Sequence, residues 1–194
     1  MTTDPMATNN ARMQRWLIQD RWLPLLSGED PKAAVELVLH ILASNPRQQL
    51  FEVALRSPKA IEAIRLIKSE VPHIKCGGGT VLETKDLLNL HEIGADFAVS
   101  PGFHSDLALL AVKIDMAYLP AVMSPSEIMA GLQLGYQCFK FFPAEAAGSV
   151  PMLQAFSGPF PRVRFCPTGG ISKQVKDKYL ALKNVIAVGG SVKL

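Results

Sequence analysis

Apolar residues in this chain form short runs, separated by longer segments of mixed polarity. Eight of these runs have the length and the bordering turn residues of buried β-strands. We predict strands at Leu23–Ser27, Leu50–Leu55, Ile74–Gly78, Phe97–Ser100, Ala117–Val122, Cys138–Phe142, Val163–Thr168 and Val185–Gly189. Their first residues lie roughly 20 to 27 positions apart, which is the length of a strand plus the helix that follows it.

The segments between these strands have the spacing of amphipathic helices. One of them, Pro58–Glu70, places Ile61, Ile64 and Ile67 on one side, as the 3.6-residue period of a helix requires. We predict helices at Pro31–Ala43, Pro58–Glu70, Lys85–Ile93, Ser105–Val112, Ser126–Leu134, Pro151–Phe156 and Ser172–Leu182. A short amphipathic helix at Ala11–Asp20 opens the fold, and the polar residues 1–10 before it are expected to be disordered.

Alternation of strands and helices predicts parallel strands joined by crossover helices. A closed (β/α)8 TIM barrel is the simplest such architecture, and an open doubly wound sheet is the alternative. Because the chain has 194 residues, we expect one domain that spans residues 1–194.

The expected barrel lacks its last C-terminal helix. After Ser191 only Val192, Lys193 and Leu194 remain, which is too few for the helix that normally covers the first and eighth strands. The N-terminal helix, another subunit or residues beyond this sequence must therefore cover that apolar face.

Composition and charge narrow the class of protein. Hydrophobic residues make up 48% of the chain and charged residues 19%. The 20 basic residues are scattered among 17 acidic ones, which gives no basic patch for nucleic acid. The chain has no apolar stretch of membrane-spanning length and no secretory signal at its start, so we expect a cytoplasmic protein. Its 3 cysteines and 4 histidines lack metal-ligand spacing, so we expect no metal site.

Lys140 is the unusual residue of the chain, because it interrupts an apolar, aromatic run that is predicted to be a strand. Alternation along this strand puts Cys138, Lys140 and Phe142 on one face and Phe139 and Phe141 on the other. If both faces are covered, Lys140 is buried, and burial disfavours its charged ammonium form. A free amine in such a place can attack a carbonyl carbon and form an imine. The alternative is a lysine at a strand end whose head reaches water.

The second predicted strand carries two charged residues on one face. Phe51, Val53 and Leu55 alternate with Glu52 and Arg56, so the apolar set faces the helices of a barrel and the charged pair faces its interior. Buried charges are costly, and such a pair persists mainly where it serves a site or is mutually compensated. The alternatives are therefore a functional site and a structural ion pair.

Glycine-rich segments follow several of the predicted strands, namely Gly77–Thr80, Ser100–Gly102, Pro167–Gly170 and Gly189–Ser191. The C-terminal ends of barrel strands form the active-site face, and phosphate commonly binds after strands seven and eight. Glycines allow backbone N–H groups to approach an anion closely. The last two segments therefore predict an anion site that faces Lys140.

These motifs resemble the 2-keto-3-deoxy-6-phosphogluconate (KDPG) and 4-hydroxy-2-oxoglutarate (KHG) aldolases, a family of class I, imine-forming enzymes. The resemblance extends from about Arg15 to Ser191. It is closest in Phe51–Arg56, Gly77–Val81, Ser100–Gly102, Phe139–Glu145, Val163–Ile171 and Gly189–Ser191.

The resemblance implies a role for each site residue. Lys140 forms the imine, Glu52 is the general acid/base, and Arg56 with Thr80 holds the carboxylate of pyruvate. Pro101 and Phe142 line the pyruvate pocket. The remaining residues lie at the distal, phosphate end of the substrate: Thr168, Gly169, Gly170, Gly190 and Ser191.

The implied activity is cleavage of KDPG into pyruvate and glyceraldehyde 3-phosphate, without a cofactor, by a homotrimer. Two features depart from the family pattern: Leu23–Gly28 lacks an arginine that many members carry at the end of strand one, and Ala121 replaces a glycine after Pro120. KHG and 2-keto-3-deoxy-6-phosphogalactonate are therefore alternative substrates. A catalytically silent anion-binding barrel is the alternative outside enzyme function.

Overall fold

The computed structural model describes residues 5–193. In chain order the helices are α1 Pro5–Asp20, α2 Pro31–Ser44, α3 Ala60–Glu70, α4 Thr84–Glu92, α5 Ser105–Lys113, α6 Pro125–Gln133, α7 Ser149–Phe156 and α8 Lys173–Leu180. The strands are β1 Trp22–Ser27, β2 Leu50–Ala54, β3 Lys75–Gly79, β4 Phe97–Val99, β5 Ala117–Leu119, β6 Ala121–Val122, β7 Cys138–Phe141, β8 Arg164–Pro167 and β9 Val188–Ser191. None of the helices in the described residues has the length and apolar character needed to cross a membrane.

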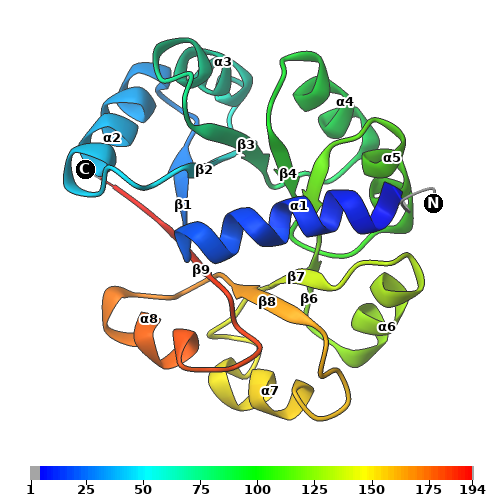
Figure 1. The fold of residues 1–194 in the computed structure, drawn as a ribbon. Coiled ribbons are helices and arrows are strands. Elements are labelled where there is room, and N and C mark those ends of the chain that lie inside the picture. Colours follow the sequence, from blue (N-terminus) through cyan, green and yellow to red (C-terminus); the bar gives the residue numbers. More distant parts are fainter. Residues whose placement is uncertain (1–4, 194) are drawn as a thin grey trace.

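The strands are parallel and form a closed ring with helices outside it (Figure 1). One sheet has the order β5-β4-β3-β2-β1-β9 and the other the order β6-β7-β8. Bridges from Phe165 to Val185 and from Thr168 to Gly189 join the two sheets on one side. On the other side, β5 pairs with β4 of the first sheet and β6 pairs with β7 of the second. These two strands were predicted as one, Ala117–Val122, and are separated only by Pro120. The structure therefore confirms the predicted closed barrel and not the alternative, an open doubly wound sheet.

The last strand lies further along the chain than predicted. We predicted Val185–Gly189, whereas β9 is Val188–Ser191. Its register is set by β1, because Val188 pairs with Trp22 and Ser191 pairs with Leu25. The strand therefore carries Gly189 and Gly190 within the sheet.

The two faces of the strands enclose two apolar clusters. Outside the ring, Phe51 and Val53 of β2 pack in one cluster with Ile64 of α3, which confirms the predicted parity of β2. Inside the ring, a second cluster contains Leu50, Phe97 and Cys138 together with Met13 and Leu17 of α1. Helix α1 lies across the N-terminal end of the barrel (Figure 1) and closes it.

Helix α1 corrects one prediction about the start of the chain. Residues 1–10 were expected to be disordered, but the helix already begins at Pro5, and Asn9 and Asn10 are buried. Asn10 donates to the carbonyl oxygen of Cys138 and accepts from the backbone N–H groups of Gln137 and Cys138. These hydrogen bonds explain why a polar segment is ordered. Residues 1–4 lie outside the described residues.

The described residues after β9, Val192 and Lys193, form no helix. A groove of about 460 Å³ lies beside them, with Ile41 of α2 and Lys176 of α8 in its lining. The Lys176 amine stacks 5.0 Å from the centre of the Trp22 ring. The N-terminal helix, another subunit and residues beyond this sequence were the candidates for covering the apolar face of the first and last strands. Helix α1 does not cover it, because α1 lies across the end of the barrel.

Candidate active site

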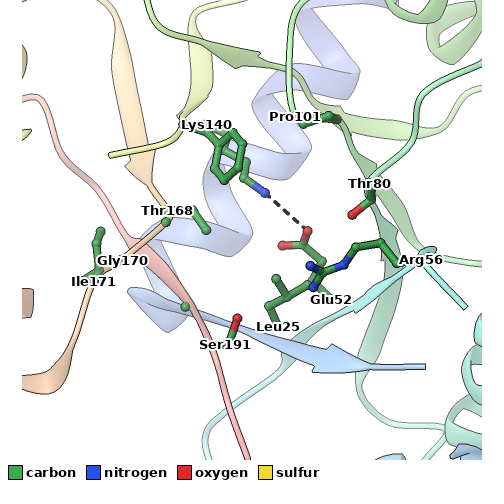
Figure 2. A pocket seen from close by; sticks show the side chains of 13 residues that line it. Leu25, Glu52, Arg56, Thr80, Pro101, Lys140, Thr168, Gly170, Ile171 and Ser191 are labelled. Carbon is green, nitrogen blue, oxygen red and sulfur yellow. Dashed lines mark ion pairs between the residues drawn. The ribbon is translucent and has the colours of Figure 1, made fainter. Parts of the chain in front are cut away.

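A pocket of about 450 Å³ opens at the C-terminal ends of the strands (Figure 2). It brings together all of the site residues predicted from the sequence and adds Leu25 and Ile171. The predicted residues in its lining are Glu52, Arg56, Thr80, Pro101, Lys140, Phe142, Thr168, Gly169, Gly170, Gly190 and Ser191. These predicted residues come from the ends of six strands, β2, β3, β4, β7, β8 and β9, which thus meet in one cavity.

Lys140 lies deep in this pocket and is 5% exposed, which agrees with the buried alternative. Strand β7 holds it, and its backbone N–H donates to the carbonyl oxygen of Pro120. The amine lies 5.3 Å from the centre of the Phe142 ring and 3.5 Å from Glu52 Oε1. The only direct charge partner of the amine in the described residues is therefore this carboxylate.

Glu52 is 1% exposed, and neither of its carboxylate oxygens has a hydrogen-bond partner among the described residues. A buried carboxylate without hydrogen bonds is costly. Gly79 of β3 makes room for it, because a Cβ atom at Gly79 would lie 2.0 Å from Glu52 Oε1. The missing side chain in β3 therefore lets Glu52 reach the amine.

Arg56 and Thr80 lie beside Glu52 on one side of the pocket (Figure 2). Arg56 follows β2 and is exposed, and it forms no ion pair with another described residue. Its planar guanidinium suits a carboxylate ligand. Thr80 has a φ of 62°, which is rare for a β-branched residue and is found mainly at functional sites.

Pro101 is held in the pocket wall by the loop after β4. Ser100 Oγ donates to the carbonyl oxygen of Gly102 and is hydrogen-bonded to the hydroxyl of Tyr118, both at 2.6 Å. Ser100 and Tyr118 are buried. Since this loop is tied to the barrel wall, the position of Pro101 is fixed from behind.

The opposite side of the pocket consists of the loops after β8 and β9. Gly169 and Gly170 have φ values of 103° and 79°, a left-handed conformation that other residues rarely adopt. Thr168 is buried, whereas Gly170 and Ser191 are exposed at the rim. This side offers backbone and hydroxyl groups to a ligand rather than charged side chains.

Leu25 and Ile171 are the two lining residues that sequence reasoning did not assign. Leu25 lies near the end of β1, where the absence of an arginine had been noted. This departure from the family pattern therefore already pointed to the position of Leu25. Ile171 follows Gly170 in a quoted motif, but an apolar residue gives no chemical sign of a pocket.

Cys166 lies next to Lys140 in the paired strands β7 and β8. Burial raises the pKa of its thiol to about 12, while the Lys140 charge opposes this shift. The thiol is therefore protonated at neutral pH and is not a nucleophile. Among the described residues, no three His, Cys, Asp or Glu side chains are grouped so as to hold a metal ion.

A family model described as KDPG and KHG aldolase matches residues 14–194. The chain belongs to this family. The KHG/KDPG aldolase of Escherichia coli K12 is 44% identical over 169 residues, which cover 87% of this chain and 78% of the relative. The 2-dehydro-3-deoxy-phosphogluconate aldolase of Pseudomonas aeruginosa is 40% identical over 181 residues, which cover 93% and 81%.

Solved structures of KDPG aldolases have the same fold. One is the KDPG aldolase of Legionella pneumophila, crystallised with pyruvate captured at low pH as a covalent carbinolamine intermediate. It superimposes with a TM-score of 0.87 at 38% identity and covers 98% of this chain and 87% of its own. The KDPG aldolase of Zymomonas mobilis ATCC 29191 gives 0.86 at 41% identity, with 91% and 84% covered.

Proposed function

We propose that this protein is a class I aldolase that cleaves KDPG into pyruvate and glyceraldehyde 3-phosphate. The observation that carries the proposal is the buried amine of Lys140, 3.5 Å from the unpartnered carboxylate of Glu52. A nucleophile and a proton acceptor within reach of each other are what imine chemistry requires. The names of the relatives and of the solved structures support the same reaction.

In the first half of the reaction Lys140 becomes bonded to the substrate. Glu52 takes a proton from the ammonium group, and the free amine attacks the ketone carbon C2 of KDPG. The hydroxyl of the carbinolamine then takes the proton held by Glu52 and leaves as water, which gives a protonated imine and restores the Glu52 carboxylate. Arg56 and Thr80 lie beside this point (Figure 2) and would hold the C1 carboxylate.

In the second half the bond between C3 and C4 breaks. Glu52 removes the proton of the C4 hydroxyl, C4 becomes the aldehyde carbon, and the bonding electrons move through C3 into the imine to give an enamine. A proton then returns to C3. Water hydrolyses the new imine, which releases pyruvate and restores the Lys140 amine.

Borohydride trapping tests the proposal directly. Incubation of the protein with pyruvate and borohydride should add the mass of a reduced pyruvate imine to the peptide that contains Lys140. Lys140→Arg should lose the adduct and the cleavage activity, because a guanidinium does not form the imine. Circular dichroism of the variant checks that the fold is intact. Cleavage by a folded Lys140→Arg variant would contradict the mechanism.

KHG is a second candidate substrate, and one observation favours it. The pocket lining has three charged side chains, Glu52, Arg56 and Lys140, whereas Leu25 and the glycine loops contribute none. No lining side chain in the described residues is thus a cation dedicated to a phosphate. Comparison of kcat/KM for KDPG, KHG and 2-keto-3-deoxy-6-phosphogalactonate decides between them, and equal values would remove phosphate preference.

The family resemblance also predicts a homotrimer, together with a cytoplasmic location. The trimer brings three copies of a chain of 21.1 kDa together, which light scattering of the purified protein distinguishes from a monomer.

A further inference from the structure

Three residues form a hydrogen-bonded cluster behind the loop Gly169–Gly170. Tyr179 of α8 donates its hydroxyl proton to Glu145 Oε1, and Ser149 Oγ lies 3.0 Å from the same oxygen. The hydroxyls of Ser149 and Tyr179 are also within 2.8 Å of each other. We call Glu145, Ser149 and Tyr179 the tyrosine brace. None of the three lines the pocket.

Glu145 connects the brace to the glycine loop in two ways. Its backbone N–H donates to the carbonyl oxygen of Gly169 at 3.1 Å. Its side-chain stem covers Gly170, because a Cβ atom at Gly170 would lie 2.9 Å from both Cβ and Cγ of Glu145. The glycine loop therefore rests on a side chain whose far end is fixed by Tyr179.

The two hydroxyl partners are themselves fixed. Tyr179 is 1% exposed, and burial raises its pKa to about 12 with a further contribution from Glu145. It is therefore a hydrogen-bond donor at neutral pH. Ser149 has a left-handed φ of 55° and a backbone hydrogen bond to Ala144, which direct its hydroxyl toward Glu145.

We propose that Glu145, held by Tyr179 and Ser149, is a positioning residue for the distal phosphate of the substrate. By fixing its carboxylate behind the loop, the brace orients the backbone N–H groups of Gly169 and Gly170 and keeps a negative charge out of the pocket. This inference rests on the proposed function, since it assumes that the distal end of the pocket takes a phosphate.

The test compares KDPG with 2-keto-3-deoxygluconate, which lacks only the phosphate. Tyr179→Phe removes the hydroxyl and keeps the buried ring. It should raise KM for KDPG about five- to tenfold, the effect of losing one hydrogen bond. KM for 2-keto-3-deoxygluconate and the borohydride trapping of pyruvate on Lys140 should stay as in the wild type.

Two further variants separate positioning from general damage. Glu145→Gln keeps an oxygen acceptor for both hydroxyls and should behave like the wild type with KDPG, whereas Glu145→Ala should behave like Tyr179→Phe. Tyr136→Phe is the matched control, because Tyr136 is also buried and its hydroxyl donates to the Ala108 carbonyl at 3.0 Å, away from the pocket.

Equal changes in KM for both substrates, or a lower melting temperature with unchanged selectivity, would overturn the positioning role. A wild-type protein that cleaves neither substrate and gives no pyruvate adduct would instead overturn the proposed function. The two failures are thus distinguished by the wild type alone.

Discussion

Glu52 combines burial, a short distance to an amine and two carboxylate oxygens without hydrogen bonds among the described residues. A group in this state has its lone pairs available for protons of the substrate. Glu52→Gln should therefore lower kcat by about a hundredfold or more, the usual range for an acid/base group, and leave the dissociation constant of pyruvate nearly unchanged. Single-turnover kinetics and pyruvate binding measure the two quantities. Parallel losses in both would assign Glu52 to binding alone.

At the level of single residues, the sequence identifies those whose chemistry conflicts with their surroundings. Lys140 and Glu52 are charged residues in apolar strands. Parity along the second strand predicted that Glu52 faces the barrel interior, whereas the burial of Lys140 was decided by the structure. Tyr179 gives no such signal, because a tyrosine at a buried helical position is ordinary until the position of its hydroxyl is known. Its partner Glu145 lies in the quoted motif but had no assigned role.

At the scale of elements, β3 owes its function to side chains that it lacks. A methyl group at Gly79 would occupy the place of Glu52 Oε1, so Gly79→Ala should displace the carboxylate and lower kcat about a hundredfold, as misplacement by about 1 Å does. Gly158→Ala is the control, because the nearest atom to its Cβ would be the Ala155 carbonyl oxygen at 3.9 Å. Steady-state kinetics compare the two, and equal activities would show that Glu52 adapts.

The glycine strands also mark where element boundaries could not be predicted. Apolar side chains identify a strand through their burial, but Gly189 and Gly190 have none. The prediction for the last strand therefore followed Val185, whereas pairing with β1 selects Val188–Ser191. The interruption at Pro120 follows from the missing N–H of proline, a local rule that was available from the sequence.

At the scale of the whole molecule, α1 joins the beginning of the chain to the middle. Asn10→Ala would leave the backbone groups of Gln137 and Cys138 without their partner, which costs about 1–3 kcal/mol. We expect a lower melting temperature and an unchanged kcat below the transition, since α1 and the pocket lie at opposite ends of the barrel. Calorimetry and an activity assay at 25 °C measure both. Loss of kcat in folded protein would show coupling between the ends.

The barrel was predictable because strand spacing and helix periodicity are repeated along the chain. The position of α1 was not, since it depends on hydrogen bonds between residues more than a hundred positions apart, such as Asn10 and Cys138. The sequence shows only that the first ten residues are polar. The hydrogen bonds between Asn10 and the strand at Cys138 explain why the chain is helical from Pro5.

Among the described residues, α1 closes one end of the barrel, so reactants reach the pocket from the opposite end. In the proposed reaction the bond to pyruvate would form at Lys140, which is 5% exposed, and the aldehyde portion would lie toward exposed Gly170 and Ser191. In this mechanism the aldehyde would therefore depart first and pyruvate second. In the direction of synthesis pyruvate would enter first, and the aldehyde would meet an enamine that is already formed. Under this proposal the glycine loops at the entrance would select among aldehydes, whereas the inner pocket would bind one keto acid.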